Sequence, residues 1–428
     1  MTERKIGLRE VRALKPGQTV WDTAVAGFGA RRQQSPAVSY MLIYRTREGR
    51  QRWHTIGRHG APWTPETARA EATRLLGKVV DGIDPSAVKQ AKRKAATVAE
   101  LCDLYLADAE AGRLLTRRKL PKKASTLTID RGRVARHIKP LLGQMKVAAV
   151  TREDVNGFMH DVASGKTAGN TKTARKRGLV RVRGGKGAAS RAVGLLGGIF
   201  TYAVAHRMRA DNPVRGVIRF ADGKRERRLS DDEYKMLGEA LRLADDKRVI
   251  WPAAVAAARF LALTGWRSGE ALELRWADVD LVRRTATLPN TKTGRSVRPL
   301  SREACEILRT RPRSSDLVFP ATRGNTDVIM SGFKKMWKKI AELGNLSADL
   351  TPHTLRHSFT SLAADLGYSE LTIGALVGHK GRTITSRYVH SADAVLLSAA
   401  DAVATTTAAL MSGSTGAIEV IPIRRESA

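Results

Sequence analysis

Two polar, basic interruptions most constrain how this 428-residue chain can fold. The first, residues 82–97, is rich in charge and contains Pro85, and the second combines Pro213 with the basic run 224–228. Proline and clustered like charges break helical periodicity and favour solvated linkers. The chain is also too long for one ordinary hydrophobic core. We therefore expect separate domains at 1–90, 91–220 and 221–400, followed by a C-terminal tail at 401–428.

The charge balance predicts a polyanionic partner. Lys and Arg total 75 against 41 Asp and Glu, which gives a formal net charge of +34, far beyond what solubility requires. No run of 18 apolar residues is present, and the N-terminus MTERKIGLRE has no apolar signal core, so we expect no membrane partner. The cysteines, Cys102 and Cys305, fall in different predicted domains, which is typical of a protein in a reducing cytosol.

Hydrophobic periodicity predicts a multidomain α+β chain. Residues 39–57 indicate two short strands, and 64–80 indicate a helix, so the N-terminal domain is a small α+β unit. Residues 97–216 are mostly helical in pattern. The last domain is mainly helical, with a β-hairpin or small sheet at 285–300.

A basic, glycine-rich segment interrupts the helical domain at residues 164–191. It carries nine Lys or Arg, six glycines and no acidic residue. This composition predicts a loop that becomes ordered on a phosphate backbone, and the alternative is an insertion without a role. The DNA-binding residues that we predict here are Lys172, Arg175, Lys176, Arg177, Arg181, Arg183, Lys186 and Arg191.

The stretch TPHTLRHSFTSL, residues 351–362, predicts the start of a helix that carries chemistry. Thr351 suits the N-cap and Pro352 the first helical position. His353 and Arg356 then lie one turn apart on the same face. These two groups repel each other unless an anion lies between them. The alternative is a helix start with both side chains turned to water.

Four further residues could act on the same anion. Arg267 lies at a turn between helices in LTGWRSGEALELRW, and Lys292 lies in the hairpin turn NTKTG. His379 lies in LVGHKG, and Tyr388 lies in TSRYVHS. Each has an ordinary structural explanation, as an ion pair, a solvated lysine, a helix cap or a packing residue. Their occurrence together, in this order, is improbable by chance.

That order resembles the catalytic domain of the tyrosine recombinases, the family of phage and genomic-island integrases. The family pattern is Arg, a hairpin Lys, His-x-x-Arg, His or Trp, and Tyr. The matching residues here are Arg267, Lys292, His353, Arg356, His379 and Tyr388. The match covers about 225–400 and includes TG-x-R-x-x-E at 264–270. The helical segment before it resembles the core-binding domain, and the first ninety residues resemble an arm-binding domain.

The resemblance implies a site-specific recombinase that cuts and rejoins double-stranded DNA through a 3′-phosphotyrosine. Such an enzyme integrates and excises a mobile element in the bacterial cytosol, as a tetramer on core and arm sites. A DNA-bending protein and an excision factor are the further partners expected. No metal, nucleotide or other cofactor is expected, because arginines supply the positive charge and the tyrosine link stores the bond energy. Type IB topoisomerase activity and a catalytically silent DNA-binding regulator remain the alternatives.

Physical chemistry explains why the family needs these residue types. Two guanidinium groups, Arg267 and Arg356, bind the non-bridging oxygens in fork geometry and stay charged. His379 would donate a hydrogen bond to the phosphate, and Glu270 would orient Arg267 or a histidine.

The remaining residues, Tyr388, His353 and Lys292, would carry out the proton transfers. The phenol of Tyr388, with an ordinary pKa of about 10, needs a base to act as nucleophile, and His353 is the nearest candidate. Lys292, on a flexible hairpin, would protonate the leaving 5′ oxygen. A zinc site at His353 and His357 is disfavoured because Thr354 replaces the glutamate of an HExxH motif and Arg356 would repel a cation.

The segment after the predicted nucleophile, residues 391–411, is apolar, alanine-rich and helical in pattern. We expect it to dock on an adjacent protomer and to couple the position of Tyr388 to assembly. The alternative is a terminal helix packed on its own domain.

Overall fold

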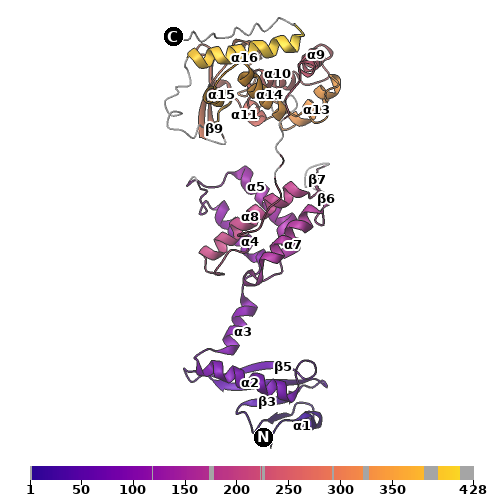
Figure 1. The fold of residues 1–428 in the computed structure, drawn as a ribbon, viewed down its shortest axis with the longest axis vertical. Helices are drawn as coiled ribbons and strands as arrows, with labels where there is room; N and C mark the ends of the chain where they lie inside the picture. Colours follow the sequence, from indigo (N-terminus) through magenta and orange to yellow (C-terminus); the bar gives the residue numbers. More distant parts are fainter. Residues whose placement is uncertain are drawn as a thin grey trace, which may run out of the picture. The chain divides into compact units, whose positions relative to one another are not determined.

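The computed structural model describes residues 2–117, 119–172, 178–221, 223, 227–291, 294–321, 327–379 and 394–414. The chain divides into two compact units, residues 1–223 and residues 224–428 (Figure 1). Arg175, Lys176 and Arg177, and both Lys292 and Tyr388, lie outside the described residues.

The N-terminal part of the first unit is a five-stranded sheet in the order β1-β2-β3-β4-β5. β1 runs parallel to β2, and the other neighbours are antiparallel. The strands are β1 (Thr2–Glu3), β2 (Thr19–Trp21), β3 (Phe28–Arg32), β4 (Val38–Arg45) and β5 (Gln51–Arg58). The flanking helices are α1 (Leu8–Ala13) and α2 (Pro65–Val80). The two strands and the helix predicted over 39–80 are confirmed.

Alternation along β4 explains how this sheet builds its core. Tyr40, Leu42 and Tyr44 are buried in one cluster with Ala68 and Leu75 of α2. Successive side chains of a strand point to opposite faces, so the apolar face of β4 lies under α2. The other face of the sheet is left without a covering helix among the described elements.

Residues 85–94, expected as part of a solvated tether, instead form helix α3 (Pro85–Lys94). Asp84 caps the helix through the backbone nitrogens of Ser86 and Ala87. The hydroxyl of Ser86 and the ammonium of Lys89 donate to carbonyl oxygens of β5 at 2.9 and 2.7 Å. The first turns of α3 therefore belong to the sheet domain, because β5 is an edge strand with free carbonyl groups.

The rest of the first unit is helical, as predicted, and has its own apolar core. Its helices are α4 (Val98–Glu110), α5 (Ala124–Arg133), η1 (Val134–Ile138), α6 (Lys139–Leu142), η2 (Val147–Ala149), α7 (Arg152–Ala163) and α8 (Lys186–Ala205). The basic segment 164–191 is not simply a loop. It contains an antiparallel hairpin, β6 (Gly169–Lys172) and β7 (Leu179–Val182), and it continues into the first turns of α8.

The second unit is a helical body with a three-stranded sheet in the order β10-β9-β8. The strands are β8 (Val279–Asp280), β9 (Thr285–Thr291) and β10 (Gly294–Pro299), so the predicted hairpin is confirmed. The helices are α9 (Asp231–Lys247), α10 (Pro252–Thr264), α11 (Ser268–Leu272), η3 (Trp276–Asp278), α12 (Arg302–Arg309), α13 (Phe333–Leu343), α14 (Pro352–Asp365), α15 (Glu370–Val377) and α16 (Ala394–Ser412). Buried α10 lies at its centre and contacts α9, α12, α13, α14 and α16.

Helix α16, which overlaps the segment predicted to dock on a neighbouring protomer, packs on its own chain. Leu396 and Val403 are among its buried residues. The helix packs on α9, α10, α12, α14 and α15 of the same unit (Figure 1). Asp401 accepts hydrogen bonds from Nη1 of Arg284 at 2.7 Å and from the backbone nitrogen of Arg302 at 2.9 Å. The other helices of this unit leave an apolar surface that α16 covers.

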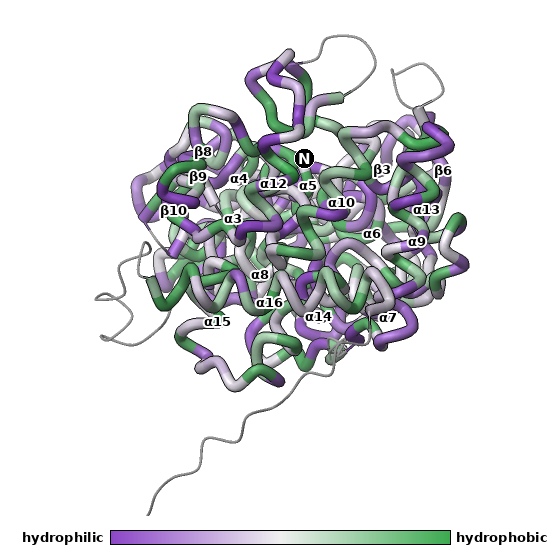
Figure 2. The backbone as a smooth tube through the Cα atoms, turned by 90° about the horizontal axis from the view of Figure 1, so that it is seen from above, coloured by the Kyte–Doolittle hydropathy of each residue, from purple (hydrophilic) through white to green (hydrophobic). Residues whose placement is uncertain are grey.

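Two helices, α8 and α16, are long and apolar enough to cross a membrane by length and composition. Each buries one face in a core of its own unit, through residues such as Ile199 and Phe200 of α8. Figure 2 shows hydrophilic and hydrophobic positions alternating along the helical segments. The apolar faces of these two helices therefore already have partners within the chain.

Candidate active site

The first site arginine is held at the junction of α10 and α11. Gly265 ends α10 in the left-handed region, at φ +61°, and a Cβ there would lie 2.6 Å from the ring of Phe359. Arg267 then forms the N-cap of α11. Its backbone nitrogen donates to Oε2 of Glu270 at 3.1 Å, and its Nη1 donates to Oε1 at 2.8 Å. Glu270 thus fixes both the backbone and the side chain of Arg267.

The second arginine, Arg356, is buried on α14 with 4% of its surface exposed. Its Nη1 donates to the carbonyl oxygen of Gly265 at 3.0 Å, and its Nη2 contacts Nε2 of His379 at 2.8 Å. Burial, followed by the charges of Arg267 and Arg298, lowers the pKa of Arg356 to about 10. Arg356 remains protonated at neutral pH, and α14 brings it beside the turn that carries Arg267.

His379 follows the end of α15, where Gly378 adopts φ +69°. The backbone nitrogen of His379 donates to the carbonyl oxygen of Gly374 at 2.7 Å. Because a guanidinium can only donate, Nε2 of the neutral ring must accept from Arg356, and Nδ1 carries the proton. Burial, then the charges of Arg356, Arg267 and Arg298, lowers the pKa of His379. The ring is therefore neutral at pH 7, with one N–H free to donate.

His353, at the first turn of α14, is exposed. Burial of part of its ring is the largest cause of a lowered pKa, followed by His357, Arg356 and Arg267. The rings of His353 and His357 pack edge to face, with centroids 4.8 Å apart. A neutral, accessible imidazole beside two arginines is suited to accept a proton.

Sequence reasoning missed one charged residue of this site, Arg298 on β10. It is fully buried, and its Nη1 donates to Oε2 of Glu270 at 2.9 Å. Its guanidinium carbon lies 5.0 Å from the ring centroid of Trp266. Burial pushes the pKa of Glu270 upward, but hydrogen bonds and charges from Arg298 and Arg267 outweigh it and lower that pKa. The pattern RSVRPL gave no signal, because arginine in a hairpin strand normally points to water.

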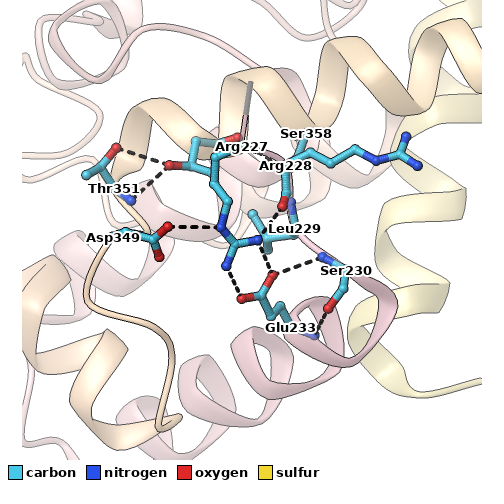
Figure 3. Close-up of polar contacts among 9 residues, drawn as sticks. Arg227, Arg228, Leu229, Ser230, Glu233, Asp349, Thr351 and Ser358 are labelled. Atoms are coloured by element: carbon cyan, nitrogen blue, oxygen red, sulfur yellow. Dashed lines mark hydrogen bonds and ion pairs between the residues drawn. The ribbon is translucent and has the colours of Figure 1, made fainter. Parts of the chain in front are cut away.

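The chain that enters the second unit is fastened to α14, the helix that carries His353 and Arg356. The guanidinium of Arg227 bridges Glu233 and Asp349, with Nη1 2.9 Å from Oε2 of Glu233 and Nε 3.1 Å from Oδ2 of Asp349 (Figure 3). Next to it, the backbone nitrogen of Leu229 donates to the hydroxyl of Ser358 at 2.8 Å. A capping box of Ser230 and Glu233 starts α9. These contacts fix the N-terminal turns of α14.

The structure thus brings together Arg267, Glu270, His353, Arg356 and His379 from three separate segments. Lys292 and Tyr388 lie outside the described residues, so their positions relative to this cluster stay predictions. The basic residues of the hairpin and early α8 that are described are all exposed: Lys172, Arg181, Arg183, Lys186 and Arg191. In the part of the chain that the structure describes, no three His, Cys, Asp or Glu side chains group as metal ligands.

Comparison with known proteins agrees with this geometry. Residues 227–394 match the phage integrase family, and residues 4–92 match the arm DNA-binding domain. Residues 227–394 therefore form a domain of the phage integrase family, and residues 4–92 form an arm DNA-binding domain. Among curated integrase relatives, the shufflon-specific DNA recombinase of Escherichia coli is 36% identical over 182 residues, 42% of this chain and 44% of that protein. Tyrosine recombinase XerA of Saccharolobus solfataricus is 26% identical over 171 residues, 39% of this chain and 53% of that protein.

The chain spans about half the length of those curated relatives. Solved structures extend the likeness of fold. A lambda integrase dimer bound to a COC′ core site superposes with TM-score 0.54 and 19% identity, over 89% of this chain and 96% of that one. The Tn1549 transposon integrase in complex with circular intermediate DNA gives TM-score 0.51 and 17% identity, over 71% and 99%. The likeness to these structures is one of fold.

Proposed function

We propose that the chain is a site-specific tyrosine recombinase that cuts and rejoins double-stranded DNA to integrate or excise a mobile element. The observation that carries the proposal is the charge of the site. Arg267, Arg298 and Arg356 surround a single carboxylate, Glu270, and His379 adds a further donor. Such a surplus of positive charge in a half-buried site is suited to a phosphodiester.

The clamp acts on the phosphate itself. Arg267 and Arg356 would each present guanidinium N–H groups to the non-bridging oxygens, where negative charge grows in the pentacoordinate transition state. Glu270 holds Arg267 in place, so little reorganisation is needed when DNA binds. The Nδ1–H of His379 would supply one more hydrogen bond. Arginine charge takes the place that a metal ion holds in other phosphoryl-transfer sites.

The covalent step would be an in-line displacement. The oxygen of Tyr388 forms a bond to phosphorus while the bond from phosphorus to the 5′ oxygen breaks. His353 takes the phenolic proton, and Lys292 gives a proton to the leaving 5′ oxygen. The product is a 3′-phosphotyrosine and a free 5′ hydroxyl. Attack by the 5′ hydroxyl of a second duplex reverses the step and reseals the strand without ATP.

Two surfaces outside the site would hold DNA. The first is the hairpin β6–β7 with the start of α8, whose described basic residues point to solvent. The second is the uncovered face of the N-terminal sheet. Register places Arg31, Ser39 and Arg58 in one row across β3, β4 and β5. Trp53, 57% exposed, lies on the same side of the sheet opposite Ile43. A basic face with an aromatic side chain is typical of a nucleic-acid surface.

Assembly follows from the reaction. Two duplexes have four strands to cut, so a tetramer on DNA would be the active form. The lambda integrase tetramer bound to a Holliday junction is a solved example with the same fold. We further propose core and arm attachment sites, a DNA-bending protein and an excision factor as partners, and the bacterial cytosol as the location. Docking of the C-terminal segment, residues 391–411, on a neighbouring protomer belongs to the same proposal.

The test has two stages. Integration of a marked element into a genome, followed by sequencing of the junctions, defines the core site. A nicked duplex with that core site should then trap an SDS-resistant adduct with the wild-type chain, in EDTA and without nucleotide. Tyr388→Phe should bind the same duplex with unchanged affinity and give no adduct. An adduct that survives this substitution, or a strict need for Mg²⁺, would contradict the proposal.

A further inference from the structure

Arg298 is unusual because an arginine side chain is rarely buried completely. Its side chain has no exposed surface, although burying a charge is costly unless the charge is paired and hydrogen-bonded. Only part of its guanidinium is satisfied. Nη1 pairs with Glu270, Nε lies 3.4 Å from the hydroxyl of Ser296, and Nη2 has no hydrogen-bond partner among the described residues. A residue kept only for stability would be better replaced by an apolar one.

The guanidinium touches both halves of the active site. On one side it binds Oε2 of Glu270, and the other oxygen of that carboxylate holds Arg267. On the other side it lies against Gly378, where a Cβ would come within 2.4 Å of both Nε and Nη2. Gly378 directly precedes His379, which contacts Arg356. Arg298 is therefore linked to Arg267 through Glu270, and to Arg356 through Gly378 and His379.

From these contacts we propose that Arg298 is a positioning residue for DNA cleavage: it locks the carboxylate that orients Arg267 and the backbone that presents His379 to Arg356. The inference rests on the proposed function, because it assigns Arg298 to the same phosphate site. Arg298 cannot touch DNA, since its side chain is fully buried. Its effect must pass through Glu270 and Gly378.

The charge of Arg298 also affects the pKa of His379, which can be measured separately from cleavage. The groups that face His379 are Arg356 of α14, Arg267 at the start of α11, Arg298 of β10 and Glu270 of α11. The three arginines favour the neutral ring, and Glu270 opposes them. Removing the charge of Arg298 should therefore raise the pKa of His379. The ring would then take up a proton at higher pH, lose its acceptor for Arg356, and move the acid limb of cleavage to higher pH.

The experiment compares full-length variants on the nicked core duplex and by NMR of labelled histidine side chains, with His379→Gln assigning the resonance. Arg298→Met should slow single-turnover cleavage about 10- to 100-fold, the range for groups that orient a reacting residue from behind. The affinity for DNA should not change. The pKa of His379 should rise. Arg298→Lys, which keeps the charge and loses the fork, should slow cleavage while leaving the titration of His379 in place.

Two further variants keep the test decisive if Arg298→Met does not fold. Glu270→Gln with Arg298→Met removes the buried pair together, so the chain should fold while cleavage stays slow. Gly378→Ala forces the guanidinium away and should reproduce the slow cleavage. The matched control is Arg209→Met, since Arg209 is 8% exposed, pairs with Asp211 and lies 5.3 Å from the ring of Phe200 in the other unit. It should leave the titration of His379 unchanged.

A purely structural Arg298 gives a different result. Cleavage by Arg298→Met, or by Gly378→Ala if Arg298→Met does not fold, within about twofold of wild type would overturn the proposal. An unchanged titration of His379 in folded Arg298→Met would also overturn it. Failure of the wild-type chain to form an adduct would instead refute the proposed function. In that case the NMR titration still decides whether Arg298 sets the protonation of His379.

Discussion

Two buried ionic clusters in this molecule differ in how completely they are paired. In the N-terminal sheet domain, the carboxylate of Asp22 has no exposed surface and accepts four hydrogen bonds. Arg69 supplies two of them, at 3.0 and 2.8 Å, and the backbone nitrogens of Ile6 and Val25 supply the others. Arg69 also donates to the carbonyl oxygen of Ile6 at 2.6 Å. One cation meets one anion, and the carboxylate is satisfied.

The cluster at the candidate active site is unbalanced. Among the described residues, Glu270 is the carboxylate that pairs with both Arg267 and Arg298. Arg356 instead contacts a carbonyl oxygen and a neutral histidine. Repulsion and burial together lower the pKa of Arg356 to about 10. A balanced pair such as Asp22 and Arg69 holds a fold together. In an unbalanced cluster the guanidinium groups repel one another, and a bound anion would reduce that repulsion. A preorganised site favours an anionic transition state in this way.

The largest effect is expected from substitutions in the unbalanced cluster. Arg267→Lys and Arg356→Lys keep the charge but lose the planar fork, so each should slow cleavage on the order of 10²-fold or more. Single-turnover cleavage of the nicked core duplex measures this. The matched control is Arg69→Lys, which changes the balanced pair in the same way and should leave core cleavage untouched. Near-normal rates for the site variants would mean that both arginines only support the fold.

Breaking the balanced pair should act on a different property. Asp22→Ala leaves Arg69 without its carboxylate and should destabilise the sheet domain by about 3 kcal/mol or more. Thermal melts should show this loss, while cleavage of a core-only duplex stays normal. Recombination on DNA with native flanking arms should fail, as it should for a chain lacking residues 1–90, because the tethered domain raises local concentration on DNA. Equal recombination by the deleted chain would refute this division of labour.

The smallest expected effect is a difference in pH dependence between the two clusters. The lowered pKa values of His353 and His379 mean that both rings stay neutral to below their ordinary pH of about 6.5. Cleavage should persist there and fall as pH drops through those lowered values. Burial raises the pKa of Asp22, but Arg69 and Ile6 outweigh it and lower it below 3.8. Its stabilisation is thus complete above 3.8 and lost only as pH falls through the lower folded value.

Cleavage rates and melts of the same samples across this range provide the measurement. Activity should disappear while the sheet domain stays folded. Loss of both at one pH would show that the acid limb reports unfolding rather than protonation of the site. His353→Gln, which removes one titrating ring, should leave a slower enzyme with a flatter acid limb.

Local sequence signals were sufficient for much of the fold. Patterns in residues 39–57 and 285–300 predicted strands, and Thr351 with Pro352 marked a helix start. The spacing of Arg267, His353, Arg356 and His379 identified residues that the structure brings together. These features depend on neighbours close in sequence or on a motif with a fixed order.

Other features depended on contacts between distant segments. Helix α3 forms where a linker was expected because β5 offers free carbonyl groups to Ser86 and Lys89. Helix α16 packs on its own unit because Arg284 and the backbone of Arg302 hold Asp401. Neither partner lies near its target in the sequence.

The sequence by itself determined the family pattern, the charge and the order of the site residues, since these are properties of residue type and spacing. Only the tertiary structure decided which arginines are buried and how they share Glu270. Arg298 looks like any solvated strand residue until β10 packs against Trp266 and Gly378. Burial and charge balance arise from segments that meet only in the folded chain, and those two quantities set the protonation and the orientation of the site.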